Sequence, residues 1–478
     1  MLSSIFSKVE SLTESHFWSP HENHDREDLG EIVYQGTLSR QNPSGGLRLE
    51  TYYLTSKKLI YFQNSNGLTK YSNLSWKVIE PFVEEEASRR YGFCISYGKK
   101  CKYFYTKSSD DLDKWLNHLS FSAIMTDIEN DYLFQKQIGT GSFAAVYLAK
   151  DLDSKKSFAI KSINKVVIQR NKRNLDQIIR EIEIMRQIDH PNIAKLYKIY
   201  ESETHVHLVL EYVAGGTLLQ RLTTKGPFSE EKSAKFIEKF LKVLRYLCQN
   251  NIVHRDIKPE NILMTDENKD TSFKLIDFGL ACVYTGNLTS SCGSPGYVAP
   301  EILRKIPYDP KVDVFSAGII LYIILSGRAP FSAGSPKETL VKNRECFITF
   351  SEKYWGNVSR QAINVVLRLT QPNPLLRPTA KEALAYEWFR WKSNENMLLK
   401  STPTSFSGVW SNLPTNPSPV DTSKKGLSSN RSVRMFPFLG EKNRISMKKF
   451  NNPKLAKKIS MDLRREIETP KIKVKIHS

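Results

Sequence analysis

Alternating apolar and polar residues dominate the first third of the chain. Runs of this kind occur at residues 31–38, 47–54, 58–62, 91–97 and 102–106. Such alternation is typical of β-strands with one buried face. A later stretch places Leu112, Trp115 and Leu116 on one face of a helix. The pattern therefore predicts a small β-domain over residues 29–125 that ends in one helix, preceded by a polar lead-in at residues 1–28.

The pattern changes after residue 132, where short apolar strands precede stretches with helical periodicity, as at residues 175–188. The longest apolar run, residues 317–325, is far shorter than the roughly 18–20 residues that a membrane-spanning helix needs. We therefore expect a buried core helix at this run and no membrane-spanning segment. A length of 478 residues indicates two globular units plus tails.

The tail, residues 395–478, is rich in Ser, Thr, Asn, Pro and Lys. Such a composition buries too little apolar surface to fold, so we expect most of the tail to be disordered. Residues 453–468 form an exception, because apolar residues recur there at every fourth position and Lys and Arg fill the rest. These apolar residues are Leu455, Ile459, Leu463 and Ile467. The spacing predicts a basic amphipathic helix.

Net charge and cysteine spacing limit the classes of protein to which the chain could belong. The net charge is +20, and much of the excess lies in the tail. A basic excess is compatible with nucleic acid, an anionic membrane face or acidic partners, and equally with a solubilising tail. The six cysteines include no pair with the CxxC spacing of zinc or redox sites. We therefore expect a cytoplasmic protein with reduced cysteines, and leave peripheral membrane attachment open.

Three separated motifs carry groups suited to handling phosphate. The first is a glycine-rich turn made of Ile138, Gly139, Thr140, Gly141, Ser142, Phe143, Ala144 and Val146. Small residues in such a turn let backbone N–H groups approach phosphate oxygens closely. The second is Lys161 in a short apolar strand, followed by a helix that carries Glu181 and Glu183. The third is a pair of neighbouring loops that present Asp256, Lys258, Asn261 and Asp277.

The order and spacing of these motifs resemble the protein kinase pattern across residues 132–389. The resemblance implies an α+β, two-lobed fold with a β-rich N-lobe and a helical C-lobe. A lysine at position 258 is similar to Ser/Thr kinases rather than Tyr kinases. Residues 274–279 and 292–301 are similar to the calcium/calmodulin-dependent protein kinase group.

The resemblance implies roles for the loop residues. Asp256 would orient the substrate hydroxyl and accept its proton, and Lys258 would offset charge on the moving phosphoryl group. Asn261 and Asp277 would supply the oxygen ligands that Mg²⁺ prefers.

The resemblance also implies an ATP site. Lys161 would contact the α- and β-phosphates and pair with Glu181, which is favoured over Glu183 by its distance from residues 190–193. The adenine would contact Ala159, Glu211, Val213 and Leu263.

Residues 280–301 resemble an activation loop. Alignment from Gly293 and Pro295 favours Ser290 as a phosphorylation site, at which a phosphate could pair with Arg255. Unmodified loop hydroxyls remain the alternative.

The family pattern further implies two structural contacts. We expect an ion pair between Glu301 and Arg377, and Asp313 is expected to hold the backbone of the catalytic loop. Thr217 and Ile323 depart from acidic residues that often contact basic substrates, so the substrate preference is left open.

Residues 29–125 resemble a pleckstrin homology domain, because several antiparallel strands precede one helix with a tryptophan. The resemblance implies a small β-barrel or sandwich. Such domains often hold inositol phosphates with basic residues on the first two strands, where Arg40 and Arg48 are the only arginines here. Binding to an anionic membrane, binding to a protein and a purely structural role remain open.

We therefore expect a protein serine/threonine kinase that uses ATP and Mg²⁺, acts on protein substrates in intracellular signalling, and does not bind nucleic acid. A catalytically silent kinase-like scaffold and a membrane adaptor are the alternatives. The helix at residues 453–468 resembles the autoinhibitory junction of calcium-dependent protein kinases, although no EF-hand loop follows it. It is expected to dock on the kinase domain or to bind calmodulin. A helix without a partner and a segment that lies weakly on a membrane surface remain the alternatives.

Overall fold

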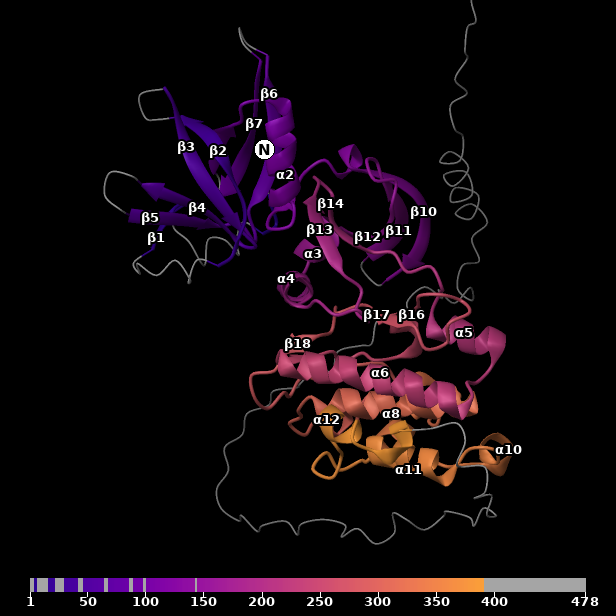
Figure 1. The fold of residues 1–478 in the computed structure, drawn as a ribbon. Coiled ribbons are helices and arrows are strands. Elements are labelled where there is room, and N and C mark those ends of the chain that lie inside the picture. The colour runs from indigo at the N-terminus through magenta and orange to yellow at the C-terminus, as the bar shows by residue number, and fades with distance from the viewer. Residues whose placement is uncertain are drawn as a thin grey trace, which may run out of the picture. The chain divides into compact units, whose positions relative to one another are not determined.

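The computed structural model describes residues 4–6, 16–21, 30–41, 46–63, 68–85, 89–97, 100–141 and 144–390 (Figure 1). All of these residues fall in one compact unit, which spans residues 1–413. The helix predicted at residues 453–468 and the disorder predicted for the tail lie outside the described residues.

The N-terminal region is rich in antiparallel strands. These are β1 (Ser19–His21), β2 (Ile32–Gln41), β3 (Leu47–Thr55), β4 (Lys58–Gln63), β5 (Leu68–Asn73), β6 (Val78–Glu84), β7 (Arg90–Tyr97) and β8 (Lys100–Tyr105), followed by helix α2 (Ser109–Leu119). Neighbours pair in the order β1-β5-β4-β3-β2-β8-β7-β6. The strands and the final helix expected from the alternating pattern are therefore present.

This sheet does not close into a barrel. Strand β6 pairs in parallel with β9 (Ile124–Met125), and β9 pairs in parallel with β13 (Leu196–Glu201) of the following region. Strand β1 lies at the opposite edge and pairs with β5. Of the two forms expected for this domain, a barrel or a sandwich, the closed barrel is wrong for the described residues, because β9 occupies the edge of β6 that closure would require.

Helix α2 packs on this sheet through its apolar stripe. It begins after Ser108, whose Oγ accepts a hydrogen bond from the backbone N–H of Asp111 (3.2 Å). The Trp115 side chain is fully buried, and its ring centroid lies 4.9 Å from that of Tyr34. A Cβ atom at Gly36 would lie 3.1 Å from the Trp115 ring, so a glycine allows this close approach.

The region from residue 132 begins with five antiparallel strands and two helices. They are β10 (Tyr132–Thr140), β11 (Ala144–Asp151), β12 (Ser157–Asn164), α3 (Lys165–Gln169), α4 (Lys172–Gln187), β13 and β14 (His205–Glu211). Helix α4 starts three residues before the predicted helix at 175–188, because Asn171 Oδ1 accepts a hydrogen bond from the Arg173 N–H (3.0 Å) and caps it there.

The rest of the chain is mainly helical. The helices are α5 (Leu218–Lys225), α6 (Glu230–Gln249), α7 (Pro300–Leu303), α8 (Lys311–Ser326), α9 (Pro336–Glu345), α10 (Glu352–Trp355), α11 (Arg360–Leu369) and α12 (Ala380–Ala383). Two short strand pairs join them, β15 (Ile252–Val253) with β18 (Cys282–Val283), and β16 (Ile262–Met264) with β17 (Phe273–Leu275). Helices α6 and α8 lie side by side, and α11 packs against α8 (Figure 1).

Helix α8 forms the centre of the helical part. Every residue from Val312 to Ser326 is buried, so the run at 317–325 is confirmed as a core helix. A Cβ atom at Gly318 would lie 2.7 Å from Thr370 Cγ2, which explains a glycine inside a helix. No helix among the described residues is both long enough and apolar enough to cross a bilayer.

Two buried contacts expected from the family pattern are confirmed. Arg377 Nη1 and Nη2 donate to the carboxylate of Glu301 at 2.6 and 3.0 Å, and both residues are 1% exposed. Asp313 accepts hydrogen bonds from the backbone N–H groups of His254 (2.7 Å) and Arg255 (2.9 Å). The ion pair fixes α7 to the segment before α12, and Asp313 fixes the loop that follows β15.

Replacing Arg377 by Met should leave the Glu301 carboxylate buried without its partner. Breaking a buried ion pair in this way costs about 3–5 kcal/mol, so we expect a loss of that size in the free energy of unfolding, measured by urea titration. Lys242→Met removes an exposed pair with Glu238 (2.6 Å) and is the matched control, with an expected cost below about 1 kcal/mol. Equal losses for the two variants would contradict the prediction.

Candidate active site

Three charged side chains from three elements meet at Lys161. Strand β12 carries Lys161, and its Nζ lies 2.6 Å from Oε1 of Glu181 on α4 and 3.3 Å from Oδ1 of Asp277. Glu181 is buried, whereas Glu183, the alternative partner, is exposed. The geometry therefore pairs Lys161 with the glutamate that the sequence favours, and adds a second carboxylate to it.

This cluster shifts the protonation of its members toward the charged forms. Burial by itself lowers the pKa of Lys161, but the carboxylates of Glu181 and Asp277 outweigh it and raise that pKa above its ordinary value. The Lys161 ammonium in turn holds the pKa of Asp277 below its ordinary value, against the opposing effect of burial. At neutral pH the cluster therefore contains one cation and ionised Asp277.

A second cluster surrounds the carboxylate of Asp256. Its Oδ2 accepts hydrogen bonds from Lys258 Nζ (2.7 Å) and Asn261 Nδ2 (3.1 Å), and its Oδ1 accepts one from Ser294 Oγ (2.6 Å). Lys258 Nζ also donates to Ser294 Oγ (3.0 Å). Asp256 is only 8% exposed, so these donors fix the direction of its carboxylate.

The two loops that carry these clusters are joined to each other. Strand β16 follows the first loop and β17 precedes the second, and the two strands pair antiparallel. The backbone N–H of Ile276 donates to the carbonyl oxygen of Asn261 (2.9 Å). Arg255 and Asp277 both have left-handed backbones, with φ of 65° and 63°. Non-glycine residues adopt this conformation at an energetic cost, which is common at functional sites.

The glycine-rich turn lies on the β10–β11 hairpin. The N–H of Gly141 donates to the carbonyl oxygen of Ala144 (2.7 Å), and Gly139 pairs with Val146 across a bulge in the ladder. Ile138 is 41% exposed, Thr140 is exposed and Gly139 is half-buried, while Ser142 and Phe143 lie outside the described residues. Val146 also pairs with Lys161, so this turn and the lysine lie on adjacent strands.

The predicted adenine contacts come from two sheets. Ala159 pairs with Leu210 across β12 and β14, and Leu263 forms an isolated bridge with Thr217. The backbone N–H of Glu211 donates to the carbonyl oxygen of Lys195 (2.9 Å).

The connection between the strand-rich and helical parts is tight. A Cβ atom at Gly215 would lie 2.3 Å from the carbonyl oxygen of Met264, so this position needs glycine. Val213 is half-buried in the same connection. The connection therefore passes directly over β16 at the floor of the predicted nucleotide site.

The donor set fits a hard divalent cation. Asn261 uses its Nδ2 to bond Asp256, which leaves its amide oxygen available as a ligand. Asp277 directs only Oδ1 toward Lys161 and Gly279, which leaves Oδ2 available. Two oxygen ligands are the number that Mg²⁺ commonly takes from a protein when phosphate oxygens and water complete its shell.

The activation-loop candidate Ser290 contacts Arg255. Arg255 Nη1 lies 2.6 Å from Ser290 Oγ and 3.2 Å from the hydroxyl of Tyr308. Ser290 is exposed, so its hydroxyl faces both solvent and a guanidinium. The sequence does not identify Tyr308, which donates to the carbonyl oxygen of Ser290 (2.7 Å) and belongs to the same cluster.

Ser294 is the main residue that the sequence analysis misses. Its hydroxyl bridges Asp256 and Lys258, so it belongs to the catalytic cluster. Nothing in the residue type singles out a loop serine. Its position between Gly293 and Pro295, the two residues that locate Ser290, is the signal that could have found it.

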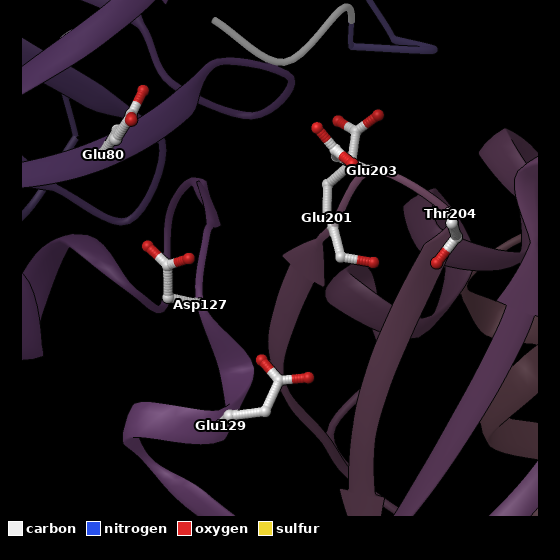
Figure 2. A pocket seen from close by; sticks show the side chains of 7 residues that line it. Glu80, Asp127, Glu129, Glu201, Glu203 and Thr204 are labelled. Atoms are coloured by element: carbon white, nitrogen blue, oxygen red, sulfur yellow. The ribbon is translucent and has the colours of Figure 1, made fainter.

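A separate acidic pocket lies away from these clusters. Its walls are Glu80, Asp127, Glu129, Glu201, Ser202, Glu203 and Thr204, and its volume is about 580 Å³. Figure 2 shows the carboxylates around the open space, contributed by β6, the segment after β9, the end of β13 and the turn that follows it. Within the described part of the chain no group of three or more His, Cys, Asp or Glu side chains is arranged to hold a metal ion. The pocket is therefore not assigned a ligand.

Comparison with known proteins agrees with this geometry. The protein kinase domain family matches residues 132–389. Myosin light chain kinase A of Dictyostelium discoideum is 35% identical over 277 residues, which cover 57% of this chain and 93% of that protein. Calcium/calmodulin-dependent protein kinase type 1 of Macrobrachium nipponense is 35% identical over 55% of this chain and 76% of that protein.

A longer relative is matched only in part. A Plasmodium falciparum protein named "Probable serine/threonine-protein kinase 2" is 38% identical over 281 residues, which cover 59% of this chain and 54% of that protein. The chain thus spans about half the length of this relative. The matches and the geometry agree on one conclusion: the chain belongs to the protein kinase family, and residues 132–389 form its ATP-dependent serine/threonine kinase domain.

Proposed function

We propose that the whole protein transfers the γ-phosphoryl group of ATP to serine and threonine hydroxyls of other proteins in intracellular signalling. The observation that carries this proposal is the convergence on Asp256 of Lys258, Asn261 and Ser294, all within 3.1 Å of its carboxylate. A carboxylate held by three donors has a fixed direction, which is what a group that must orient a substrate hydroxyl requires.

Asp256 acts on the incoming hydroxyl group. Its Oδ1 already accepts a hydrogen bond from the Ser294 hydroxyl at 2.6 Å, so the same carboxylate is placed to accept one from a substrate serine or threonine. In the reaction it orients the attacking oxygen and receives the proton. Lys258 remains beside it as a fixed positive charge that stabilises the negative phosphoryl oxygens during transfer.

Lys161 holds the phosphates in line with that oxygen. Glu181 orients its ammonium group, which would contact the α- and β-phosphates of ATP. The backbone of residues 138–141 and 144–146 would cover the phosphates, and Ala159, Val213 and Leu263 would enclose the adenine. Asn261 and Asp277 would hold Mg²⁺, which when bound neutralises phosphate charge.

A catalytically silent scaffold is the alternative for the kinase domain. Silent members of the family usually lack one of the four charged or amide groups. Here Lys161, Asp256, Asn261 and Asp277 are all present. Lys161 also keeps its contact with Glu181. These contacts favour an active enzyme.

Asp277→Ala should abolish phosphate transfer, because it removes a metal ligand and a partner of Lys161. Asp256→Asn keeps the shape of the side chain but removes the base, and we expect kcat to fall on the order of 10²–10⁴-fold. The measurement is transfer from ATP to a peptide library with Mg²⁺. Asp113→Asn, an exposed position on α2, is the control and should retain the wild-type rate. Retained turnover in Asp277→Ala would contradict the assignment, and nucleotide binding without turnover in the wild type would favour the scaffold.

We further propose that Ser290 is phosphorylated and that the phosphate pairs with Arg255. The support is the 2.6 Å contact between Arg255 Nη1 and the Ser290 hydroxyl, together with the exposure of Ser290. A phosphate at this position would form hydrogen bonds with a charged donor that is already fixed to the catalytic loop.

The Ser290→Ala variant should be about tenfold less active than wild-type protein phosphorylated at Ser290. Loss of a hydrogen bond to a charged group costs enough free energy to produce a change of that size. Ser291→Ala, the adjacent exposed serine, is the matched control and should have no effect. Mass spectrometry of active protein should locate phosphate on Ser290. Full activity of a chain without phosphate at this residue would contradict the proposal.

The basic tail is proposed to regulate the kinase domain. The support is the spacing of apolar residues at 453–468, a region outside the described residues, and the similarity to calcium/calmodulin-dependent kinases. The helix would either dock on the kinase domain or bind calmodulin.

Truncation near residue 440 should raise basal activity and remove any response to Ca²⁺ and calmodulin, because it deletes the predicted helix. The measurement is the peptide phosphorylation rate of the full and truncated chains, each with and without Ca²⁺/calmodulin. Unchanged basal activity would argue against autoinhibition.

For residues 29–125 we propose a pleckstrin homology-like fold with a structural role. The strand order of β2 to β8, followed by α2 with its buried Trp115, supports the fold. Arg40 and Arg48 both pair with the buried carboxylate of Glu50, at 3.3 and 3.1 Å, which offsets the charge that a membrane site would need. Salt-sensitive binding to anionic vesicles would favour the membrane role instead.

A further inference from the structure

Helix α4 carries a second functional face beside Glu181. Ile178, Ile182 and Arg186 follow at intervals of four residues and lie on one stripe of the helix. Ile178 and Ile182 are 7% and 0% exposed. The buried cluster around them includes residues from outside the kinase domain, namely Ile5, Phe6, Val78 and Ile124. The helix that orients Lys161 is therefore packed against the N-terminal part of the chain.

Arg186 makes the polar contacts of this stripe. Its Nη1 donates to the carbonyl oxygen of Ser75, and its Nη2 donates to that of Ala123 (3.3 Å). Its guanidinium carbon lies 5.5 Å from the ring centroid of Trp76, and Phe6 stacks on the same ring with the centroids 5.1 Å apart. Burial lowers the pKa of Arg186 to about 10, so the group remains charged at neutral pH.

Residues 4–6 are fixed to the kinase N-lobe by Glu201. The Ser4 hydroxyl and the Ile5 backbone N–H donate to the two oxygens of this carboxylate, at 2.7 and 2.8 Å. Lys165 Nζ lies 2.7 Å from Glu201 Oε1 and completes the buried cluster. Glu201 stands at the edge of the acidic pocket, beside Glu203 (Figure 2).

A continuous sheet adds a backbone connection between the same two parts. Met125 on β9 pairs with Ile79 of β6 on one side and with Tyr200 of β13 on the other. Side-chain packing, charged hydrogen bonds and backbone pairing therefore converge on the surroundings of α4.

We propose that the N-terminal region is an intramolecular clamp on α4, and that Arg186 is the positioning residue that keeps Glu181 against Lys161. The clamp consists of Ile5, Phe6, Ser75, Trp76 and Ala123. Without it, Ile178 and Ile182 would keep only their apolar neighbours in the kinase N-lobe, such as Ile168 and Leu208, and Arg186 would lose its partners. The orientation of α4 would then be less firmly fixed. Because only the orientation with Glu181 inward holds Lys161, the fraction of active enzyme falls with the population of that orientation. The proposal rests on the phosphotransfer function proposed above.

Arg186→Met in the full chain tests the clamp. We expect kcat to fall about tenfold, since two hydrogen bonds from a charged donor are lost. Amide hydrogen exchange should become faster over residues 172–187 and stay unchanged over α6. Arg186→Lys keeps one donor and should retain part of the rate. Lys172→Met, an exposed position on the same helix, is the matched control and should change neither measurement.

A double-mutant cycle separates positioning from general destabilisation. If Arg186 acts through Glu181, then Arg186→Met should lower kcat little further in a Glu181→Gln background. If Arg186 had a purely structural effect, the fold-loss in kcat of the double variant would equal the product of the two single fold-losses. Phe6→Ala removes the ring that stacks on Trp76 and should produce the same faster exchange over residues 172–187. This second variant keeps the proposal testable if Arg186→Met does not fold.

Each outcome decides the proposal. Faster exchange confined to α4 with a lower kcat supports the clamp. The clamp would be overturned if Arg186→Met and Phe6→Ala both kept the wild-type exchange and kcat. It would also be overturned if the fold-losses of Arg186→Met and Glu181→Gln multiplied, or if removing the contact raised kcat. The exchange measurement needs no phosphate transfer, so faster exchange in a chain without kinase activity would overturn the proposed function and leave the clamp standing.

Discussion

The ammonium group of Lys161 is the point on which the active site depends. Its two carboxylate partners, at 2.6 and 3.3 Å, come from α4 and from the loop after β17, so one side chain connects both lobes. A partly buried cation without partners is unfavourable, so both carboxylates contribute to holding Lys161 in place. The position of α4 and the direction of Asp277 are both linked to this one side chain.

Backbone conformation at the two catalytic loops follows the same logic. The left-handed residues Arg255 and Asp277 each cost of the order of 1–3 kcal/mol in isolation. Asp313 holds the first loop through two backbone hydrogen bonds, and the contact with Lys161 holds the second. The rigid helical core around α8 thus maintains the strained positions that present Asp256 and Asp277 to the substrates.

The catalytic loops could be predicted from the sequence because the residues of each loop lie close together along the chain. Asp256 and Asn261 are five residues apart, and the short apolar strands β16 and β17 mark the loops on either side of the site. Ser294 lies 38 residues from its partner Asp256, and no periodic pattern connects them. The open sheet was not predicted because β9 is only two residues long, too short for alternation to be recognised. The lead-in at residues 1–28 is predicted as polar, yet Ile5 and Phe6 are buried against residues far along the chain.

The bonds between residues 4–6 and Glu201 have a consequence for how the protein is made. Ser4 precedes its partner by 197 residues, and ribosomes add about 5–20 residues per second. Ser4 is therefore synthesised roughly ten to forty seconds before Glu201. During that interval the hydrogen bonds to Glu201 cannot form, so this end of the chain can join the kinase N-lobe only after β13 has been made.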